Sequence, residues 1–228
     1  MGIRYLGSKR ASGAYQAIIS KMPPHDTYIE THLGSGSIML LKPPALRSIG
    51  VDINRKVINR FHNENIELVN KDAIEFLKEF NFRSAGRTLI YSDPPYLHST
   101  RALTERYEYE YSEEDHQKLL AVLKDVPASV IVSGYPSELY DNQLRGWNTY
   151  QFQVMTRGGV RTEQIWFNFA EDVPFWCTYA GKNYTDRQRI KRKAMSWADR
   201  FKKLPPNERT AILAALLQSQ GLPEEVNL

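Results

Sequence analysis

The chain has 228 residues, of which 42% are hydrophobic and 25% are charged, and its net charge is +4 at pH 7. This length and hydrophobic content are sufficient for one α/β domain with a small appendage. The single cysteine, Cys177, excludes an internal disulfide and a cysteine-cluster metal site, and the five histidines lack metal-ligand spacing. No apolar run approaches the roughly 20 residues of a membrane span, and no signal-peptide core is present, so we expect a cytoplasmic protein without metal or membrane contact.

Strand-like and helix-like segments alternate along the first two thirds of the chain, which is typical of a mainly parallel sheet with right-handed crossovers. The predicted strands lie near 27–31, 48–52, 66–70, 88–92 and 129–134. The predicted helices lie near 10–21, 37–42, 54–63, 73–80 and 113–124. Two alternations of aromatic and polar residues, 150–154 and 164–169, flank a glycine-bearing loop and predict an antiparallel hairpin that closes the sheet.

Ligand-binding signals follow the first three predicted strands. The turn at Gly34-Ser35-Gly36 comes between a strand and a helix, where the absence of side chains lets the backbone approach a ligand closely. Asp52 ends the second strand, 16 residues beyond Gly36, and an acidic residue at this place accepts the ribose hydroxyls of a nucleoside. Asp72 follows the third strand and fits two roles, contact with the same ligand or an N-cap for the helix that begins at Ala73.

The run Asp93-Pro94-Pro95-Tyr96 follows the strand 88–92 and suits the capture of a planar amino group. The aspartate accepts a hydrogen bond from one amino N–H, the prolines aim a backbone carbonyl at the other, and the tyrosine ring stacks on the base. Such contacts draw the nitrogen lone pair out of conjugation and make it more nucleophilic. The alternative is an Asp-Pro turn with a surface tyrosine.

These segments occur in the order of the motifs of Dam-like DNA adenine-N6 methyltransferases of the phage and prophage type. Asp93–Tyr96 resembles motif IV, the glycine turn resembles motif I, and Arg4-Tyr5-Leu6-Gly7-Ser8-Lys9 resembles motif X, although a flexible basic N-terminus is the alternative there. The match covers about residues 1–170. It departs from the family pattern at Thr31-His32, where Pro-Phe is usual before the glycines.

The resemblance implies a Rossmann-like S-adenosylmethionine-dependent methyltransferase fold, with a mainly parallel sheet, a terminal antiparallel hairpin and a helical C-terminal appendage. It implies methyl transfer from S-adenosylmethionine to the N6 amino group of adenine in duplex DNA, with the target base flipped out of the stack. The catalytic residues that it implies are Asp93, Pro94, Pro95 and Tyr96. The cofactor-binding residues that it implies are Tyr5, Lys9, Gly34, Gly36, Asp52, Asp72 and Asp93.

Three other functions stay open at this point. A DNA cytosine-N4 methyltransferase shares the chemistry, an RNA or protein amino-methyltransferase shares the cofactor, and a catalytically silent nucleic-acid-binding module needs only the basic tail. The chain between Gly36 and Asp93 has no room for the helical target-recognition domain that Dam-like enzymes insert there. We therefore expect short or relaxed sequence specificity. The sequence predicts no oligomeric state.

Two loops are predicted to reach the DNA. The polar and aromatic segment after Tyr96 carries Arg101 and Arg106 and is expected to fold as a flap over the extruded base, with an exposed loop as the alternative. The loop of the predicted hairpin carries Arg157 and Arg161, which suit phosphate contacts. Both loops would face the edge of the sheet where Asp93 lies.

The C-terminal part is basic and helical. Residues 182–203 hold nine lysines or arginines and two aspartates, and Arg189, Arg192 and Lys193 are the expected DNA contacts. The first helix is predicted to carry an apolar stripe formed by Ile190, Ala194, Trp197, Phe201 and Leu204. A second helix, with Ile212, Leu213, Leu216 and Leu217, is predicted to pack on this stripe. The expected division is a catalytic domain over 1–175 and a basic extension over 176–228, with a merely solvated charged face as the alternative for the latter.

Overall fold

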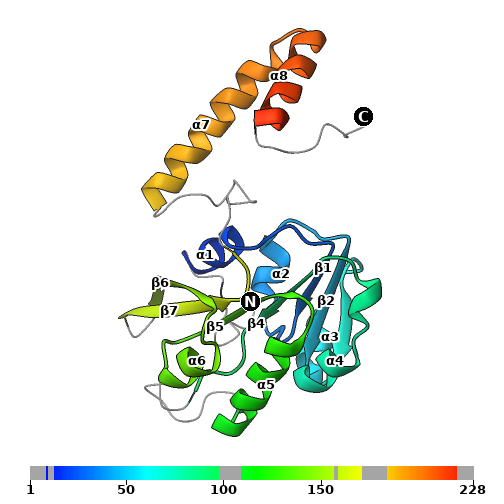
Figure 1. Ribbon diagram of the computed structural model, residues 1–228, viewed down its shortest axis with the longest axis vertical. Helices are drawn as coiled ribbons and strands as arrows, with labels where there is room; N and C mark the ends of the chain where they lie inside the picture. The colour runs from blue at the N-terminus through cyan, green and yellow to red at the C-terminus, as the bar shows by residue number, and fades with distance from the viewer. Residues whose placement is uncertain (1–8, 10–12, 98–108, 157–158, 171–183, 220–228) are drawn as a thin grey trace. The chain divides into compact units, whose positions relative to one another are not determined.

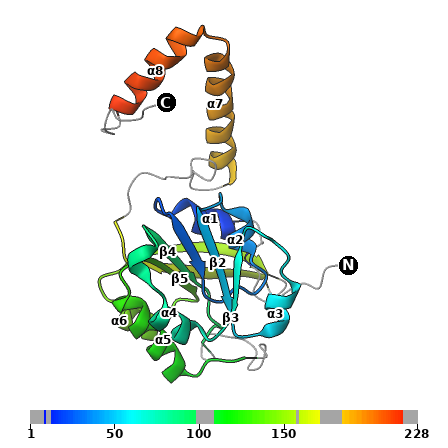
Figure 2. The ribbon, with the colours of Figure 1, turned by 90° about the vertical axis from the view of Figure 1, so that its right-hand side faces the viewer.

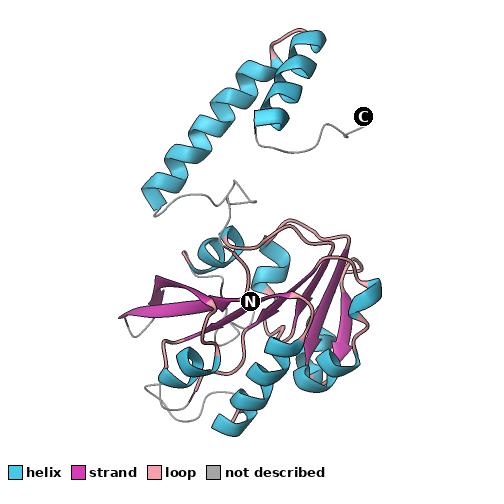
Figure 3. Cartoon of the chain, viewed as in Figure 1, coloured by secondary structure: helices cyan, strands magenta, loops and turns pink. Residues whose placement is uncertain are grey.

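A computed structural model describes residues 9, 13–97, 109–156, 159–170 and 184–219. The chain forms two compact units, Met1–Tyr179 and Ala180–Leu228 (Figures 1 and 3). The strands of the first unit are β1 (Thr27–Glu30), β2 (Arg47–Asp52), β3 (Glu67–Asn70), β4 (Thr88–Ser92), β5 (Ser129–Gly134), β6 (Asn148–Thr156) and β7 (Gly159–Phe167). Its helices are α1 (Ala14–Ser20), α2 (Ser37–Leu41), α3 (Arg55–Arg60), α4 (Ala73–Glu79), the 3-10 turn η1 (Phe82–Ser84), α5 (Glu113–Asp125) and α6 (Glu138–Gln143).

The seven strands form one sheet in the order β3-β2-β1-β4-β5-β7-β6. The first five strands pair in parallel, with Ile29 of β1 opposite Ile49 of β2 and Ile90 of β4. Strand β7 runs antiparallel between β5 and β6, and β6 and β7 are consecutive in the chain. This arrangement confirms the predicted Rossmann-like fold, a mainly parallel sheet with a terminal antiparallel hairpin.

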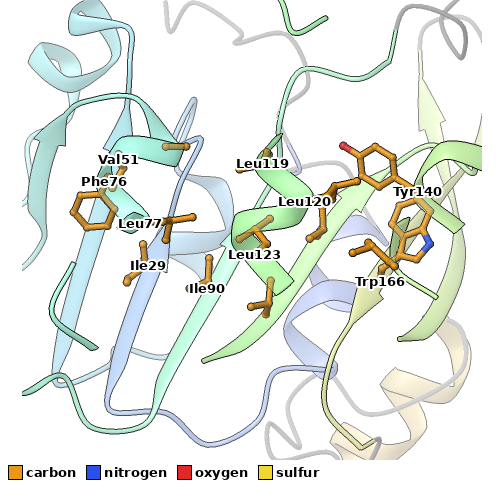
Figure 4. Close-up of a cluster of buried hydrophobic side chains, with 14 of the residues drawn as sticks. Ile29, Val51, Phe76, Leu77, Ile90, Leu119, Leu120, Leu123, Tyr140 and Trp166 are labelled. Atoms are coloured by element: carbon orange, nitrogen blue, oxygen red, sulfur yellow. The ribbon is translucent and has the colours of Figure 1, made fainter. Parts of the chain in front are cut away.

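Helices cover both faces of the sheet because its strands are apolar on both sides (Figures 1 and 2). On one face, Ile29 and Ile90 pack with Phe76 and Leu77 of α4 and with the leucines of α5 (Figure 4). The other face buries the alternate strand residues together with side chains of α1, α2 and α3; its largest members are Tyr28, Tyr91, Phe167, Ile18 and Ile19. The period of two along each strand therefore divides the core into two layers.

The predicted elements are present in the structure, but the helix predicted over 54–63 covers only Arg55–Arg60, η1 and α6 were not predicted, and the hairpin differs in length. Helix α6 was not predicted because only Leu139 and Tyr140 are apolar in this segment, so no helical period appears in the sequence. It begins at the N-cap Ser137, whose side chain accepts a hydrogen bond from Tyr140 N–H, and Tyr140 packs on Trp166 with ring centroids 4.9 Å apart. The hairpin strands are longer than predicted, nine residues each. The beginning of the predicted helix 10–21 lies outside the described residues.

The second unit contains α7 (Tyr184–Lys202) and α8 (Pro206–Ser219). The prediction that the two helices bury one apolar stripe is wrong at its centre, because Trp197 of α7 is 62% exposed and Leu216 of α8 is 57% exposed. Ile212 and Leu213 are also exposed. The physical reason lies in α8, whose apolar residues are spread around the helix instead of forming one face. The side chain of Leu217 lies outside the described residues.

The glycine turn after β1 generates the first testable prediction. Gly36 has φ +58°, and a Cβ added there would overlap the ring of Phe61. Gly36→Ala should therefore lower the free energy of unfolding by roughly 2–3 kcal/mol, because left-handed backbone strain and the displacement of Phe61 add up. Urea denaturation measures the loss.

Gly146→Ala is the matched control for this substitution. Gly146 also has positive φ, +89°, but no atom lies within 4 Å of an added Cβ. Gly146→Ala should therefore lower the free energy of unfolding only by the cost of left-handed backbone strain, roughly 1–2 kcal/mol. Equal losses in the two variants would show that Phe61 does not constrain the turn.

Candidate active site

Polar residues follow four neighbouring parallel strands at the same edge of the sheet. Gly34 comes after β1, Asp52 ends β2, Asp72 comes after β3 and Asp93 comes after β4. These strands are adjacent in the order β3-β2-β1-β4 and run in the same direction, so their carboxyl ends lie side by side. In open α/β sheets this edge is where ligands bind.

The carboxylate of Asp52 ties the glycine turn to the end of β2. Its Oδ2 accepts a hydrogen bond from Gly34 N–H at 2.9 Å, and its Oδ1 accepts one from Asn54 N–H at 2.8 Å. Asp52 is 7% exposed, and this burial raises the pKa of its carboxyl while the two backbone donors oppose the rise. Each oxygen keeps acceptor capacity for a further donor such as a ribose hydroxyl.

A second buried carboxyl, that of Glu30, links the two elements on either side of the same turn. Its Oε2 accepts hydrogen bonds from the Tyr28 hydroxyl at 3.0 Å and from Met39 N–H, in α2, at 2.9 Å. Burial raises the pKa of Glu30 to about 8 and lowers the pKa of nearby Lys42 to about 8. Glu30 therefore connects the end of β1 to α2, on either side of the glycine turn.

Asp72 acts as the N-cap of α4. Its Oδ1 accepts hydrogen bonds from Ile74 N–H at 2.8 Å and from Glu75 N–H at 3.1 Å. Of the two roles that the sequence permits for Asp72, the structure contains the cap. The side chain remains at the carboxyl edge beside Asp52, so contact with a ligand stays a prediction.

Asp93 and Tyr96 meet Lys9, from which they are 84 and 87 residues distant in the sequence. Lys9 Nζ donates hydrogen bonds to both carboxylate oxygens of Asp93, each at 2.7 Å, and to the Tyr96 hydroxyl at 2.6 Å. The Lys9 ammonium also lies 4.9 Å from the centroid of the Tyr96 ring. Lys9 is 4% exposed, so this is a buried ion pair at the end of β4.

Residues that the sequence analysis missed complete this cluster. Ser133, in β5, donates a hydrogen bond to Asp93 Oδ1 at 2.7 Å, and its hydroxyl lies 2.9 Å from the Tyr91 hydroxyl. Glu163 of β7 places its Oε2 3.9 Å from Lys9 Nζ. Ser133 lies near the carboxyl end of a parallel strand, so the rule that pointed to Asp93 could also have pointed to Ser133. Glu163 lies within an antiparallel strand, where that rule does not apply.

Aromatic contacts fix the position of Tyr96. Its ring meets the Tyr135 ring edge to face, with centroids 4.6 Å apart and an interplanar angle of 69°. The guanidinium of Arg161 lies 5.8 Å from the centroid of Tyr135, which brings one of the predicted phosphate contacts close to the cluster. Tyr96 is 9% exposed in this arrangement.

His32, which stands where Phe is usual in the resembling family, contacts Tyr111. The His32 Nε2 lies 3.2 Å from the Tyr111 hydroxyl and its Nδ1 lies 3.1 Å from Thr31 Oγ1. The two rings also meet edge to face at 5.5 Å. Burial lowers the pKa of His32 to about 3, and nearby His116 adds to this effect, so His32 is neutral at pH 7.

The remaining predicted contacts divide into two groups. Tyr5, Arg101, Arg106 and Arg157 lie outside the described residues. Arg189, Arg192 and Lys193 lie on α7 and are exposed. Arg189 is 2.8 Å from Asp186 in the same helix, and Arg192 Nε donates to the carbonyl oxygen of Gln188 at 3.2 Å. Exposed pairs of this kind are weak and leave the guanidinium groups able to exchange partners.

Two features are absent from the residues that the structure describes. No group of three or more histidine, cysteine, aspartate or glutamate side chains there is arranged to hold a metal ion. In the same part of the chain, no helix combines the length and the apolar character needed to cross a membrane.

No protein-family model matches the sequence, and no curated protein sequence matches it. Among solved structures, the chain is similar to a SAM-dependent methyltransferase from Agrobacterium tumefaciens (TM-score 0.43, 14% identity, 67% of this chain and 58% of that chain). It is also similar to the O-methyltransferase TomG from Streptomyces achromogenes (TM-score 0.47, 12% identity, 70% and 82%). A third is magnesium protoporphyrin IX methyltransferase from Synechocystis (TM-score 0.42, 14% identity, 68% and 74%). The alignment thus spans less than two thirds of the Agrobacterium chain, and we base the fold on the strand order of this chain.

The buried Glu30 predicts a specific dependence of stability on pH. Its carboxyl, which ionises near pH 4.5 in the unfolded chain, keeps its proton up to about pH 8 in the folded protein. Its contribution to stability is therefore complete below pH 4.5 and is lost as pH rises through about 8. Relative to Glu30→Gln, whose amide does not titrate, the wild type should lose stability steadily across this window.

Urea denaturation of both proteins at several pH values measures the difference. Glu67→Gln, at an exposed glutamate paired with Arg47, is the matched control and should run parallel to the wild type. A constant difference between the wild type and Glu30→Gln would contradict the raised pKa.

Proposed function

We propose that the protein transfers a methyl group from S-adenosylmethionine to the N6 amino group of adenine in duplex DNA. The observation that carries this proposal is the half-buried carboxylate of Asp93, whose two oxygens each accept a hydrogen bond from a nitrogen donor, Lys9 Nζ, at 2.7 Å. A site for amino-directed methyl transfer needs such an acceptor. The resemblance of Asp93–Tyr96 to the family motif supports an amino group of a DNA base as the natural donor.

The residues around the glycine turn fit the nucleoside part of the cofactor. Gly34 and Gly36 both have positive φ, which glycine adopts readily, and this lets the turn present backbone groups to a ligand. Each carboxylate oxygen of Asp52 accepts one hydrogen bond from a backbone N–H and can accept another from a ribose hydroxyl. Asp72 beside it, together with Tyr5 and Lys9, completes the proposed set. The bound cofactor supplies an electrophilic methyl group on its sulfonium.

The protein's own contribution to the reaction is orientation, desolvation and polarisation. Asp93 accepts one amino N–H of the adenine, and a backbone carbonyl of the Pro94-Pro95 segment accepts the other. Both bonds direct the nitrogen lone pair toward the methyl group for an in-line transfer. The amino proton leaves after the nitrogen has become cationic, so Asp93 acts as an acceptor and need not be a strong base.

The proposed reaction requires that the target adenine is flipped out of the duplex. The N6 amino group of adenine lies inside the duplex stack, and extrusion of the base costs a few kcal/mol. Stacking on an aromatic side chain contributes about 1–3 kcal/mol per base. Tyr96, whose ring is part of the cluster at Asp93, is the proposed stacking partner.

We further propose that specificity is short or relaxed and that most DNA contacts are made to phosphates. Positive side chains from three parts of the chain serve this role: Arg101, Arg106, Arg157, Arg161, Arg189, Arg192 and Lys193. In this scheme, residues 1–175 are the catalytic domain and 176–228 hold the polyanion nonspecifically. The exposed cations of α7 and the position of Arg161 near Tyr135 support it.

The assay of methyl transfer tests the proposed function directly. Labelled methyl from S-adenosylmethionine should appear in N6-methyladenine of unmethylated duplex DNA, as measured by digestion to nucleosides and mass spectrometry. Asp93→Ala should lower the rate at least 1000-fold, because both the acceptor and its orientation of the nitrogen are lost. Cofactor binding, followed by calorimetric titration, should persist.

Each other outcome selects a different function. Label in N4-methylcytosine would indicate the cytosine enzyme, and label in RNA or protein alone would indicate those substrates. DNA binding without cofactor binding would indicate a silent binding module. An Asp93→Ala variant with normal turnover would remove the motif from the mechanism.

The hairpin arginines predict a salt-dependent contribution to DNA binding. Neutralising Arg157 and Arg161 together should weaken binding and lower the slope of log K against log salt by roughly 2, one counterion for each lost phosphate contact. Fluorescence anisotropy of labelled duplex DNA over a range of salt concentrations measures the slope.

Lys78 and Arg83 provide the control, because both precede β4 and lie toward the opposite edge of the sheet. Their joint replacement by serine should leave the slope unchanged. If the two pairs of substitutions change the slope equally, the hairpin has no special role in binding.

A further inference from the structure

The Lys9 ammonium occupies the place that the substrate amino group needs. It engages both oxygens of Asp93, and it lies over the Tyr96 ring at 4.9 Å from the centroid. An adenine amino group held by Asp93 must therefore displace Lys9 from the carboxylate of Asp93. This step rests on the function proposed above.

A displaced ammonium in this cluster requires another anion. Lys9 is 4% exposed, and a buried charge that loses its counter-ion is strongly destabilised. Breaking such a pair by removing one partner costs several times more than an exposed pair contributes. The free energy for base capture therefore depends on what receives Lys9.

Glu163 has the position and the unused acceptor for this purpose. Its Oε2 lies 3.9 Å from Lys9 Nζ, and this oxygen is buried without a hydrogen-bond partner among the described residues. The residue itself is 8% exposed. A movement of about 1 Å along the flexible lysine side chain brings the nitrogen to charge-assisted hydrogen-bond distance.

We propose that Glu163 is a positioning residue that receives the Lys9 ammonium when the substrate amino group takes its place on Asp93. No bond is made or broken in this exchange, and a neutral amino group enters while one ion pair replaces another. The groups that face Glu163 are Lys9, Asp93, Tyr96 and Tyr91. Burial raises the pKa of the Glu163 carboxyl and the charge of Lys9 lowers it, so the approach of Lys9 favours the anion.

Tyr96 connects the two positions of the lysine. Its hydroxyl accepts a hydrogen bond from Lys9 at 2.6 Å and also forms a hydrogen bond with the Glu163 side chain. Lys9 can therefore move from Asp93 to Glu163 while it keeps the contact with this hydroxyl. The exchange frees the carboxylate of Asp93.

A stability cycle tests the exchange without any assay of activity. Asp93→Asn removes the first partner of Lys9 with little change in shape, so Lys9 should pair with Glu163 in that variant. Glu163→Gln should then lower Tm by roughly 5 °C or more in the Asp93→Asn background, and by much less in the wild type. Equal shifts in the two backgrounds would overturn the proposal.

Steady-state kinetics give a second test that a merely structural role would not pass. Glu163→Gln should raise KM for duplex DNA roughly tenfold, with little change in kcat and in the Kd of the cofactor. Glu163→Asp, which keeps the charge, should recover part of the loss. The increase in KM should disappear when Lys9 is also replaced by methionine. Glu138→Gln, at an exposed glutamate of α6, is the control and should behave as the wild type.

The two tests separate this inference from the proposed function. If the wild type methylates DNA and Glu163→Gln has an unchanged KM, the exchange is wrong and the function stands. If the wild type does not methylate DNA, the proposed function fails, and the stability cycle still decides whether Glu163 receives Lys9. Should Asp93→Asn not fold, the KM comparison in the Lys9→Met background decides the question.

Discussion

The buried ion pair between Lys9 and Asp93 is the interaction on which the site depends. It joins two parts of the chain that are 84 residues apart, and both partners are mostly removed from water. Burial of two charges is unfavourable unless further hydrogen bonds satisfy them. Ser133 donates one to Asp93, and Lys9 donates one to the Tyr96 hydroxyl. The end of β4, the end of β5 and Lys9 are therefore joined through a single charged contact.

The carboxylates at the carboxyl edge of the sheet differ in the groups that donate hydrogen bonds to them. Asp72 accepts backbone N–H groups of a helix, and Asp52 accepts those of two turns. Glu30 accepts one from α2 and one from a tyrosine hydroxyl. These groups hold the backbone in place. Asp93 instead accepts hydrogen bonds from two side chains, Lys9 and Ser133.

Parallel strands explain why residues so far apart in sequence form one site. The order β3-β2-β1-β4-β5 places five consecutive carboxyl ends along one edge, and the helices that return the chain cover the two faces. The antiparallel β7 then adds a side chain from the middle of a strand, Glu163, to the same cluster. A sheet with a terminal hairpin therefore brings a hairpin residue to the cluster of Lys9 and Asp93.

The sequence by itself determined the strand positions, the glycine turn and the motif at Asp93, because each depends on local preferences: apolar runs, backbone freedom at Gly34 and Gly36, and the fixed φ of proline. It did not reveal Ser133 or Glu163, because no local pattern marks a serine in an apolar strand or a glutamate in a hairpin. It also led to a wrong prediction for Trp197, since periodicity on α7 does not say whether α8 has a face to cover it. Only tertiary structure decided that Lys9 pairs with Asp93, because the partner of a buried charge is chosen by which strand ends the fold brings together.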